Sequence, residues 1–365
     1  MKLQTAKIFR FVLWLVIFLF LGFMLIGCGS VTNDSNNDPH YLGPKLKPLP
    51  VGFIAYNVSS SNFASTSMML YKASGEPWLG LVMSNVAPEA FMSWSPSSKL
   101  LSYMCRVGDD FHYLAVVDDH GQDQVVFYNA TPGSWSPKED LLIYGVENDG
   151  LYRYRLSSET ERFYQSDENC TDQFPVFSPD ATQIAFVRWT SENHYQIMII
   201  GANGADPRLI CQGDSFIEFE PLCLQWLPSG EQLLFKVNNI GAFVVNAQSA
   251  PAQPHLVINN GDIDRIYLSP DAKVVMYFGN RIIANPRKLY LVNCDTWLEN
   301  QIIKVNERIT DVCWCPKTNP RDLAMLAPSG IYIYRLHESS YEQMKATENG
   351  GWYGNISWTT NYQPS

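Results

Sequence analysis

The sequence predicts an all-β fold: a seven-bladed β-propeller closed by pairing of its C-terminal strand with its N-terminal strands. Three observations lead to this prediction: a large apolar residue that recurs two positions before a proline, short apolar strands between these recurrences, and incomplete repeats at both ends. The recurring residues are Trp94, Trp135, Phe177, Trp226, Leu268 and Trp314. Their spacing of 41 to 49 residues is typical of propeller blades with four strands each.

The clearest repeat, residues 175–211, predicts the order of elements in one blade. Its first strand ends at the turn Ser178-Pro179-Asp180, in which proline presets the backbone and the flanking polar side chains can bond nearby amides. Strands two to four are expected at 183–188, 196–200 and 208–211. Their apolar residues are consecutive rather than alternating, so both faces of the sheet should be buried between neighbouring sheets. We expect the recurring tryptophans to pack between blades rather than to bind sugars.

Two partial repeats predict how the ring closes. Residues 51–83 contain the equivalents of strands two to four without a strand one, whereas "NISWTT" around Trp358 is a strand one with no successors. Trp358 follows Trp314 by one repeat length. Pairing the two fragments would complete a seventh blade and cover edges that would otherwise be open to aggregation.

Composition limits the function classes. The chain has 365 residues, 46% of them hydrophobic, which is too apolar for a disordered protein. Its net charge is -10, and no run of Lys or Arg follows residue 10, so no nucleic-acid binding is expected. We expect a monomer.

Residues 1–27 have the pattern of an export signal. Lys2, Lys7 and Arg10 precede an apolar run over 11–27, and no acid occurs in the first ten residues. The run is just long enough to span a bilayer, so an uncleaved anchor is the alternative.

The end of this run resembles the lipobox of bacterial lipoproteins, with Leu25, Ile26 and Gly27 directly before Cys28. The resemblance implies a signal peptide over 1–27, cleavage before Cys28, and covalent lipid on that cysteine as a stable membrane anchor. Residues 28–50 are polar and rich in Asn, Ser, Gly and Pro, and should form a tether to a propeller over 51–365. Gly29 stands where an Asp would favour inner-membrane retention. In a diderm host we therefore expect the outer membrane, with the propeller facing the periplasm.

The repeats themselves resemble those of TolB-type, WD40-like propellers. The Ser-Pro-Asp turns at 178–180 and 269–271, and the third strand with its turn in "LAVVDDHGQDQ", carry the resemblance. It implies the fold over most of 51–358 and leaves the function open, because propellers support many unrelated activities. TolB itself has six such blades, whereas the repeats of this sequence predict seven.

The connections that lead into each strand one are acidic. They contain twelve acidic and two basic residues, whereas the opposite turns contain six and five. Asp172, Glu220, Asp264 and Asp311 lie closest to strand one and are predicted to form an acidic channel mouth. Such a mouth would attract a cation or a basic partner, although solvated polar loops would give the same composition.

Motifs for catalysis are missing from the sequence. We find no nucleophile elbow, zinc-protease motif, phosphate-binding loop or dinucleotide fingerprint, and predict neither a metal site nor a cofactor besides the lipid. Cys313 and Cys315 fit two small core residues better than a metal or redox pair. A disulfide between Cys211 and Cys223 is an alternative in an oxidising compartment.

The sequence therefore predicts a lipid-anchored, non-enzymatic scaffold of the bacterial cell envelope that binds a protein, peptide or small ligand. The alternative is a propeller enzyme, a polysaccharide lyase or hydrolase with a metal in its channel. The acidic connections favour a basic partner over a polyanionic substrate.

Overall fold

The computed structural model describes the folded part of the chain. The described residues are 52–59, 66–73, 80–84, 91–107, 111–118, 123–156, 160–191, 193–214, 224–279, 288–305, 307–317, 321–337, 340–347 and 356–359. Within these ranges, no helix is long and apolar enough to cross a membrane. The predicted signal peptide, lipidation site and tether lie outside them.

The described strands pair into seven four-stranded antiparallel sheets. Six of them, numbered in chain order, contain consecutive strands. Sheet 1 contains β4 (Met92–Trp94), β5 (Leu100–Val107), β6 (Phe111–Asp118) and β7 (Asp123–Tyr128). Sheet 2 contains β8 (Ala130–Trp135), β9 (Leu141–Val146), β10 (Gly150–Arg155) and β11 (Glu161–Gln165). Sheet 3 contains β12 (Thr171–Phe177), β13 (Gln183–Ser191), β14 (His194–Gly201) and β15 (Arg208–Asp214).

Sheets 4 to 6 repeat this order. Sheet 4 contains β16 (Leu224–Trp226), β17 (Gln232–Val237), β18 (Gly241–Asn246) and β19 (His255–Ile258). Sheet 5 contains β20 (Ile263–Leu268), β21 (Val274–Gly279), β22 (Lys288–Asn293) and β23 (Glu299–Lys304). Sheet 6 contains β24 (Asp311–Trp314), β25 (Asp322–Ala327), β26 (Gly330–Leu336) and β27 (Tyr341–Thr347).

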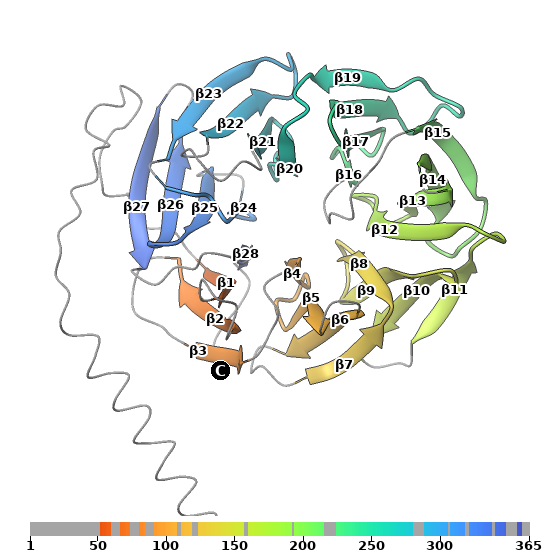
Figure 1. Ribbon diagram of the computed structural model, residues 1–365, viewed down its shortest axis with the longest axis horizontal. Coiled ribbons are helices and arrows are strands. Elements are labelled where there is room, and N and C mark those ends of the chain that lie inside the picture. The colour runs from red at the N-terminus through yellow and green to blue at the C-terminus, as the bar shows by residue number, and fades with distance from the viewer. Residues whose placement is uncertain are drawn as a thin grey trace, which may run out of the picture. The chain divides into compact units, whose positions relative to one another are not determined.

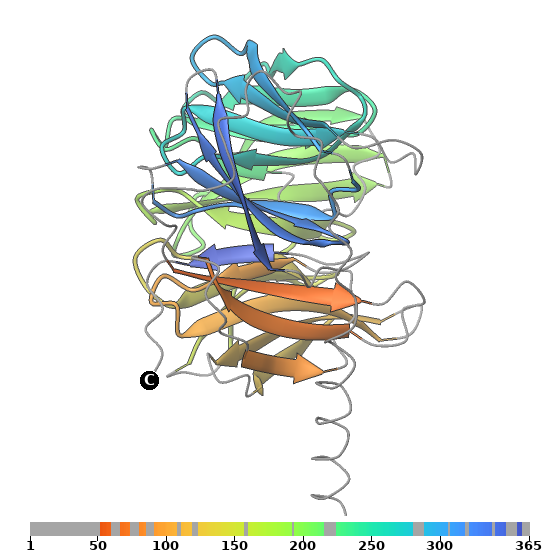
Figure 2. The same cartoon turned by 90° about the vertical axis from the view of Figure 1, so that its left-hand side faces the viewer.

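The seventh sheet, here called the composite sheet, joins strands from distant parts of the sequence. It has the order β28 (Ile356–Thr359), β1 (Phe53–Ser59), β2 (Thr66–Lys72) and β3 (Gly80–Ser84). β28 and β1 are antiparallel, with Ile54 opposite Trp358 and Tyr56 opposite Ile356. Figure 2 shows blue β28 alongside orange β1. The N-terminal strands therefore pair with the strand that the sequence analysis assigned to them.

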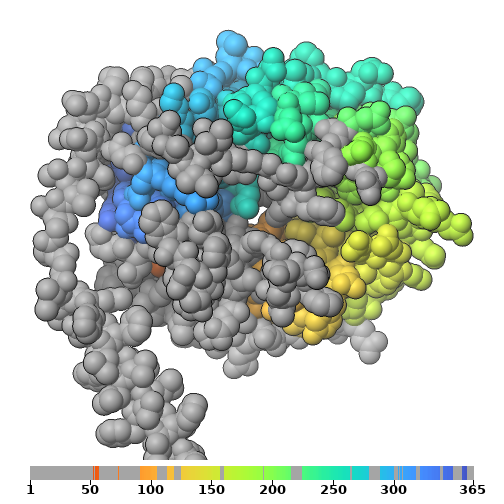
Figure 3. Space-filling view, viewed as in Figure 1, coloured from red at the N-terminus to blue at the C-terminus, as the bar shows by residue number. Residues whose placement is uncertain are grey.

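The sheets lie side by side around a common axis, with the first strand of each sheet innermost (Figure 1). The space-filling view shows sheets 2 to 4, from yellow to green, as one continuous curved wall (Figure 3). The prediction of an all-β propeller is confirmed by this arrangement.

The core lies between neighbouring sheets. On β13, Ile184 and Phe186 pack with Ile143 of sheet 2, whereas Ala185 and Val187 belong to the cluster that contains sheet 4. All four β13 side chains are at most 1% exposed. Consecutive apolar residues are therefore required because each face of the sheet meets a different neighbour.

The recurring tryptophans connect adjacent sheets by hydrogen bonds as well as by packing. The indole Nε1 of Trp226 donates to the carbonyl of Val176 at 3.1 Å. Trp135 donates to the Ser93 carbonyl, and Trp314 to the Tyr267 carbonyl, both at 3.0 Å. In each case the acceptor lies on the innermost strand of the preceding sheet, which supports the predicted packing role.

Candidate functional site

The predicted acidic mouth lies at the end of the channel where the innermost strands begin. Asp172, Asp264 and Asp311 lie in β12, β20 and β24, respectively. Glu220, the lipobox residues 25–27 and Cys28 lie outside the described residues.

Asp172 is a fully buried carboxylate near the start of β12. Its two oxygens accept hydrogen bonds from Nε and Nη2 of Arg188, at 2.7 and 2.9 Å. Antiparallel pairing of β12 with β13 places these two residues directly opposite each other. The Ser166 hydroxyl donates a further hydrogen bond of 2.7 Å to the same carboxylate.

Arg188 is buried as well, and its guanidinium holds several groups together. Besides Asp172, it contacts the carboxylate of Asp167 and donates from Nη2 to the Tyr164 hydroxyl at 2.8 Å. Burial disfavours its charge, but the hydrogen bonds and charge of Asp172 outweigh burial and raise the pKa of Arg188 above its ordinary value. Asp172 and Arg188 therefore form a buried ion pair within sheet 3.

Asp311, the first residue of β24, connects three sheets. Its Oδ1 accepts from Nη1 of Arg265 at 3.2 Å and from the Tyr267 hydroxyl, both on β20 of sheet 5. Its Oδ2 accepts from the backbone N–H of Ile356 in β28 at 3.1 Å. One carboxylate of sheet 6 thus contacts sheet 5 and the composite sheet.

Burial dominates the electrostatics around Asp311. It raises the pKa of this carboxyl above 3.8, although the charge of Arg265 and the hydrogen bonds from Tyr267 and Ile356 act in the opposite direction. Burial, followed by the charge of Asp311, raises the pKa of Tyr267 well above its ordinary value. The tyrosine therefore remains a hydrogen-bond donor at neutral pH.

The sequence-based prediction of an acidic mouth assumed that Asp172 and Asp311 present free carboxylates to solvent. Both are instead buried and hydrogen-bonded. Asp172 is bound by Arg188, a base on strand two that a count restricted to the connections leaves out, whereas Asp311 is bound by Arg265, one of the two bases within the connections. Any binding at this end must therefore use exposed side chains.

Exposed acids do remain at this end of the channel. The side chains of Asp167 and Asp214 are 69% and 84% exposed, and Glu168 and Asp262 are exposed too. In contrast, Arg188 and Lys236 are only 4% and 2% exposed. The exposed charge from these six residues is therefore acidic, because Arg188 and Lys236 lie beneath the surface. Arg265 at the same end is partly exposed, with 23% of its side chain accessible.

The cysteines behave as core residues in the described part of the chain. Cys313 and Cys315 pack in the cluster between sheet 6 and the composite sheet, and burial raises the pKa of Cys315 to about 11. Cys211 is a buried free thiol, and Cys223, the other cysteine of the alternative disulfide, lies outside the described residues. Among the described residues, no three His, Cys, Asp or Glu side chains are arranged to hold a metal ion.

The opposite end of the channel is formed by the turns between strands one and two. In sheet 3, the Ser178 hydroxyl donates to Oδ1 of Asp180 at 2.6 Å, and Thr182 donates to Asp180 from its backbone and its hydroxyl, at 3.1 and 2.8 Å. These hydrogen bonds, led by that of Ser178, lower the pKa of Asp180 to about 2. The turn thus fixes an ionised carboxylate near the surface.

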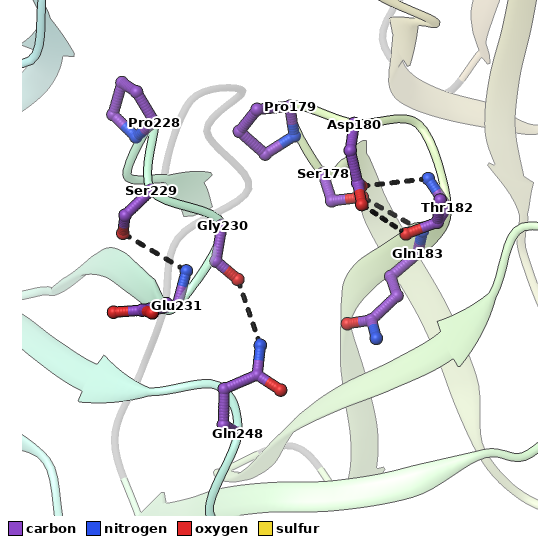
Figure 4. A pocket seen from close by; sticks show the side chains of 10 residues that line it. All are labelled: Ser178, Pro179, Asp180, Thr182, Gln183, Pro228, Ser229, Gly230, Glu231 and Gln248. Carbon is purple, nitrogen blue, oxygen red and sulfur yellow. Dashed lines mark hydrogen bonds between the residues drawn. The ribbon is translucent and has the colours of Figure 1, made fainter.

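A pocket of about 210 Å³ lies between this turn and the equivalent turn of sheet 4 (Figure 4). Sheet 3 lines it with residues between Ser178 and Gln183, and sheet 4 with 228–231 and Gln248. Gln248 donates from Nε2 to the Gly230 carbonyl at 3.2 Å, which holds the sheet 4 side of the pocket together. The turn was predictable from the sequence, whereas the pocket was not predicted.

Sequence comparisons relate the chain to a curated protein over only part of its length. No family model matches the chain. An uncharacterized protein of Escherichia coli, YidR, is 27% identical over 148 residues, which are 38% of this chain and 34% of YidR. The chain thus matches only about a third of the length of that curated relative.

The solved structures that are similar to the chain include β-propellers of different kinds. An oligogalacturonate lyase in complex with manganese has a TM-score of 0.52 at 10% identity, covering 80% of this chain and 85% of the lyase. The Cps50 (Swd1) propeller domain of Myceliophteria thermophila has a TM-score of 0.50 at 12% identity, covering 72% and 88%. TolB from Acinetobacter baumannii has a TM-score of 0.49 at 14% identity, covering 70% and 64%. The lyase and the Cps50 domain support an all-β propeller fold, and identities this low define the fold rather than the activity.

Proposed function

We propose that the protein is a non-enzymatic binding scaffold of the bacterial cell envelope, anchored by lipid on Cys28. In this proposal its seven sheets are the blades of a ring that the pairing of β28 with β1 closes. The propeller faces the periplasm, from the outer membrane in a diderm host, and works as a monomer. Its partner is a basic envelope protein or peptide.

The distribution of exposed charge supports a basic partner. At the end of the channel where the innermost strands begin, Asp167, Glu168, Asp214 and Asp262 are exposed, whereas Arg188 and Lys236 are buried. Exposed carboxylates around a concave mouth raise the local concentration of cationic partners and accelerate their association. Glu220 and Asp264 belong to the same proposed surface.

The described carboxylates nearest the axis support a scaffold more than a channel enzyme. Asp172 and Asp311 are each held by an arginine and by at least one further donor, so they build and connect sheets. A lyase or hydrolase with a channel metal is the alternative, and it shares its fold class with the manganese-bound lyase. The charge of the exposed acids disfavours the polyanionic substrate that such a lyase would need.

Neutralising the exposed acids tests the proposal. We expect the combined change Asp167→Asn, Glu168→Gln, Asp214→Asn and Asp262→Asn to preserve folding and slow capture of a basic partner, most clearly at low salt. Partners would be isolated from crosslinked envelopes, and association rates measured at several ionic strengths.

Four lysines at the opposite end provide the control. Lys99, Lys138, Lys273 and Lys317 are all exposed and can be changed to Gln. Loss of capture in the lysine variant, with normal capture in the acid variant, would contradict the proposed surface.

A further inference from the structure

The junction between sheets 3 and 4 brings two acidic positions together. Two positions can be compared at each junction. The first is the third residue after the recurring strand-one residue of one sheet. The second belongs to the next sheet and lies two positions before the strand-two partner of that sheet's recurring residue. In sheet 3 the first position is Asp180, three residues after Phe177. In sheet 4 the second position is Glu231, because Trp226 pairs with Leu233.

The same two positions form an ion pair between sheets 5 and 6. Asp271 belongs to a second Ser-Pro-Asp turn, where the Ser269 hydroxyl donates to its Oδ1 at 2.7 Å, as Ser178 does to Asp180. Trp314 pairs with Leu323, so Arg321 occupies the position of Glu231. Its Nη2 donates to Oδ2 of Asp271 at 2.6 Å. A guanidinium from the next sheet therefore binds the acid of this turn.

A direct contact also joins these positions between sheets 1 and 2. Ser97 occupies the first position and donates from its backbone N–H to Oδ1 of Asp140, which occupies the second, at 3.1 Å. Of the junctions at which both positions are described, only that of sheets 3 and 4 pairs two acids. Its carboxylates cannot bond each other when both are ionised.

The pocket lies at this junction of like charges. Figure 4 shows the carboxylate of Glu231 turned away from Asp180, and no described residue donates a hydrogen bond to it. Gly230 leaves the pocket open, since a Cβ at this position would meet only Cδ of Pro179, at 4.0 Å. Lys138 of sheet 2 contributes to the low pKa of Asp180 through its charge but does not line the pocket.

We propose that this pocket binds the guanidinium of an arginine side chain on a partner peptide, in the way that Asp271 binds Arg321. The planar guanidinium has five donors, enough to serve Asp180 and a reoriented Glu231 together, which the three donors of a lysine do less well. A volume of about 210 Å³ is below the roughly 300–1,000 Å³ of pockets that enclose a whole small molecule, and it suits the head of one side chain.

This site is independent of the proposed acidic surface. It lies beyond Phe177 at the end of β12, whereas Asp172 lies at the start of the same strand. Failure of a probe to bind in this pocket is therefore distinguishable from failure of the acidic surface to capture a basic partner.

The experiment uses the full chain and a defined probe, N-acetyl-arginine amide, with its neutral citrulline analogue as the matched control. Binding is measured by saturation-transfer difference NMR. We expect the citrulline analogue to bind about tenfold more weakly, because it lacks the charge that strengthens hydrogen bonds to carboxylates.

Two reciprocal variants test the location. Glu231→Arg should recreate the ion pair of sheets 5 and 6, abolish probe binding and raise the melting temperature. Arg321→Glu should create a second site for the probe beside Asp271. Glu231→Gln, which keeps the shape of the side chain, should weaken binding without abolishing it.

Three results would overturn the proposal. They are equal binding of the two probes, unchanged binding by Glu231→Arg, and displacement of the arginine probe by calcium at constant ionic strength. The last result would assign the two carboxylates to a metal ion.

Discussion

Replacing Asp311 by asparagine should loosen β28 specifically. An asparagine side chain has one acceptor oxygen, whereas Asp311 accepts through both oxygens, from Arg265 and Tyr267 on one side and from the Ile356 N–H on the other. The single oxygen should stay towards Arg265 and Tyr267, which supply two donors, so that the new NH2 group faces the Ile356 N–H and leaves it unpaired. A buried donor without a partner costs about 1–3 kcal/mol, so amide exchange in 356–359 should accelerate by about fivefold to a hundredfold.

Hydrogen exchange followed by mass spectrometry on a peptide that contains β28 is the appropriate assay. Asp172→Asn is the matched control, because it also neutralises a buried, arginine-bound carboxylate, but within sheet 3. The reasoning fails if both variants change exchange in 356–359 equally, or if Asp311→Asn leaves it unchanged.

The same variant has a predictable pH dependence. The folded-state pKa of Asp311 is raised, so ionisation of this group disfavours the folded state. Its contribution to stability is present in full below the unfolded value near 3.8 and is lost as the pH rises through the folded value. The stability deficit of Asp311→Asn relative to the natural chain should therefore increase from neutral to mildly acidic pH, as measured by denaturant unfolding.

The remaining predictions concern the anchor and the composite sheet. Cys28→Ala should block both cleavage of the leader and labelling by a radioactive fatty acid, and continued processing and labelling of the variant would exclude lipidation at this residue. Truncation before Asn355 should destabilise or aggregate the protein, because it removes Ile356 and Trp358, each 4% exposed and each worth about 1.5–3 kcal/mol of burial. An unchanged melting temperature would show that β28 contributes little.

The sequence predicted the strands well because the recurring residue and its proline mark the end of each innermost strand. It also contained the signal for the pair of Asp172 and Arg188, since an antiparallel hairpin places the end of strand two beside the start of strand one. Counting charges only in the connections concealed this signal.

Contacts between sheets were harder to predict. Arg265 and Asp311 are 46 residues apart and lie on different sheets, so their contact depends on how two sheets pack, which no local pattern specifies. The pocket could have been predicted from the sequence, because aligning the turns places Asp180 and Glu231 at the positions of Asp271 and Arg321. The recurring residue alone does not reveal it, because the two positions lie in the turns beyond that residue.

The direction of the indole hydrogen bonds has a consequence for biogenesis. Trp135, Trp226 and Trp314 each donate to a carbonyl of the preceding sheet, so in each case the acceptor is synthesised before its donor. A chain that emerges from its N-terminus can therefore add each of these sheets onto one that is already in place. β1, β2 and β3 are the exception, since they must wait for β28. Such vectorial assembly would leave one unfinished sheet, rather than many, until synthesis of β28 is complete.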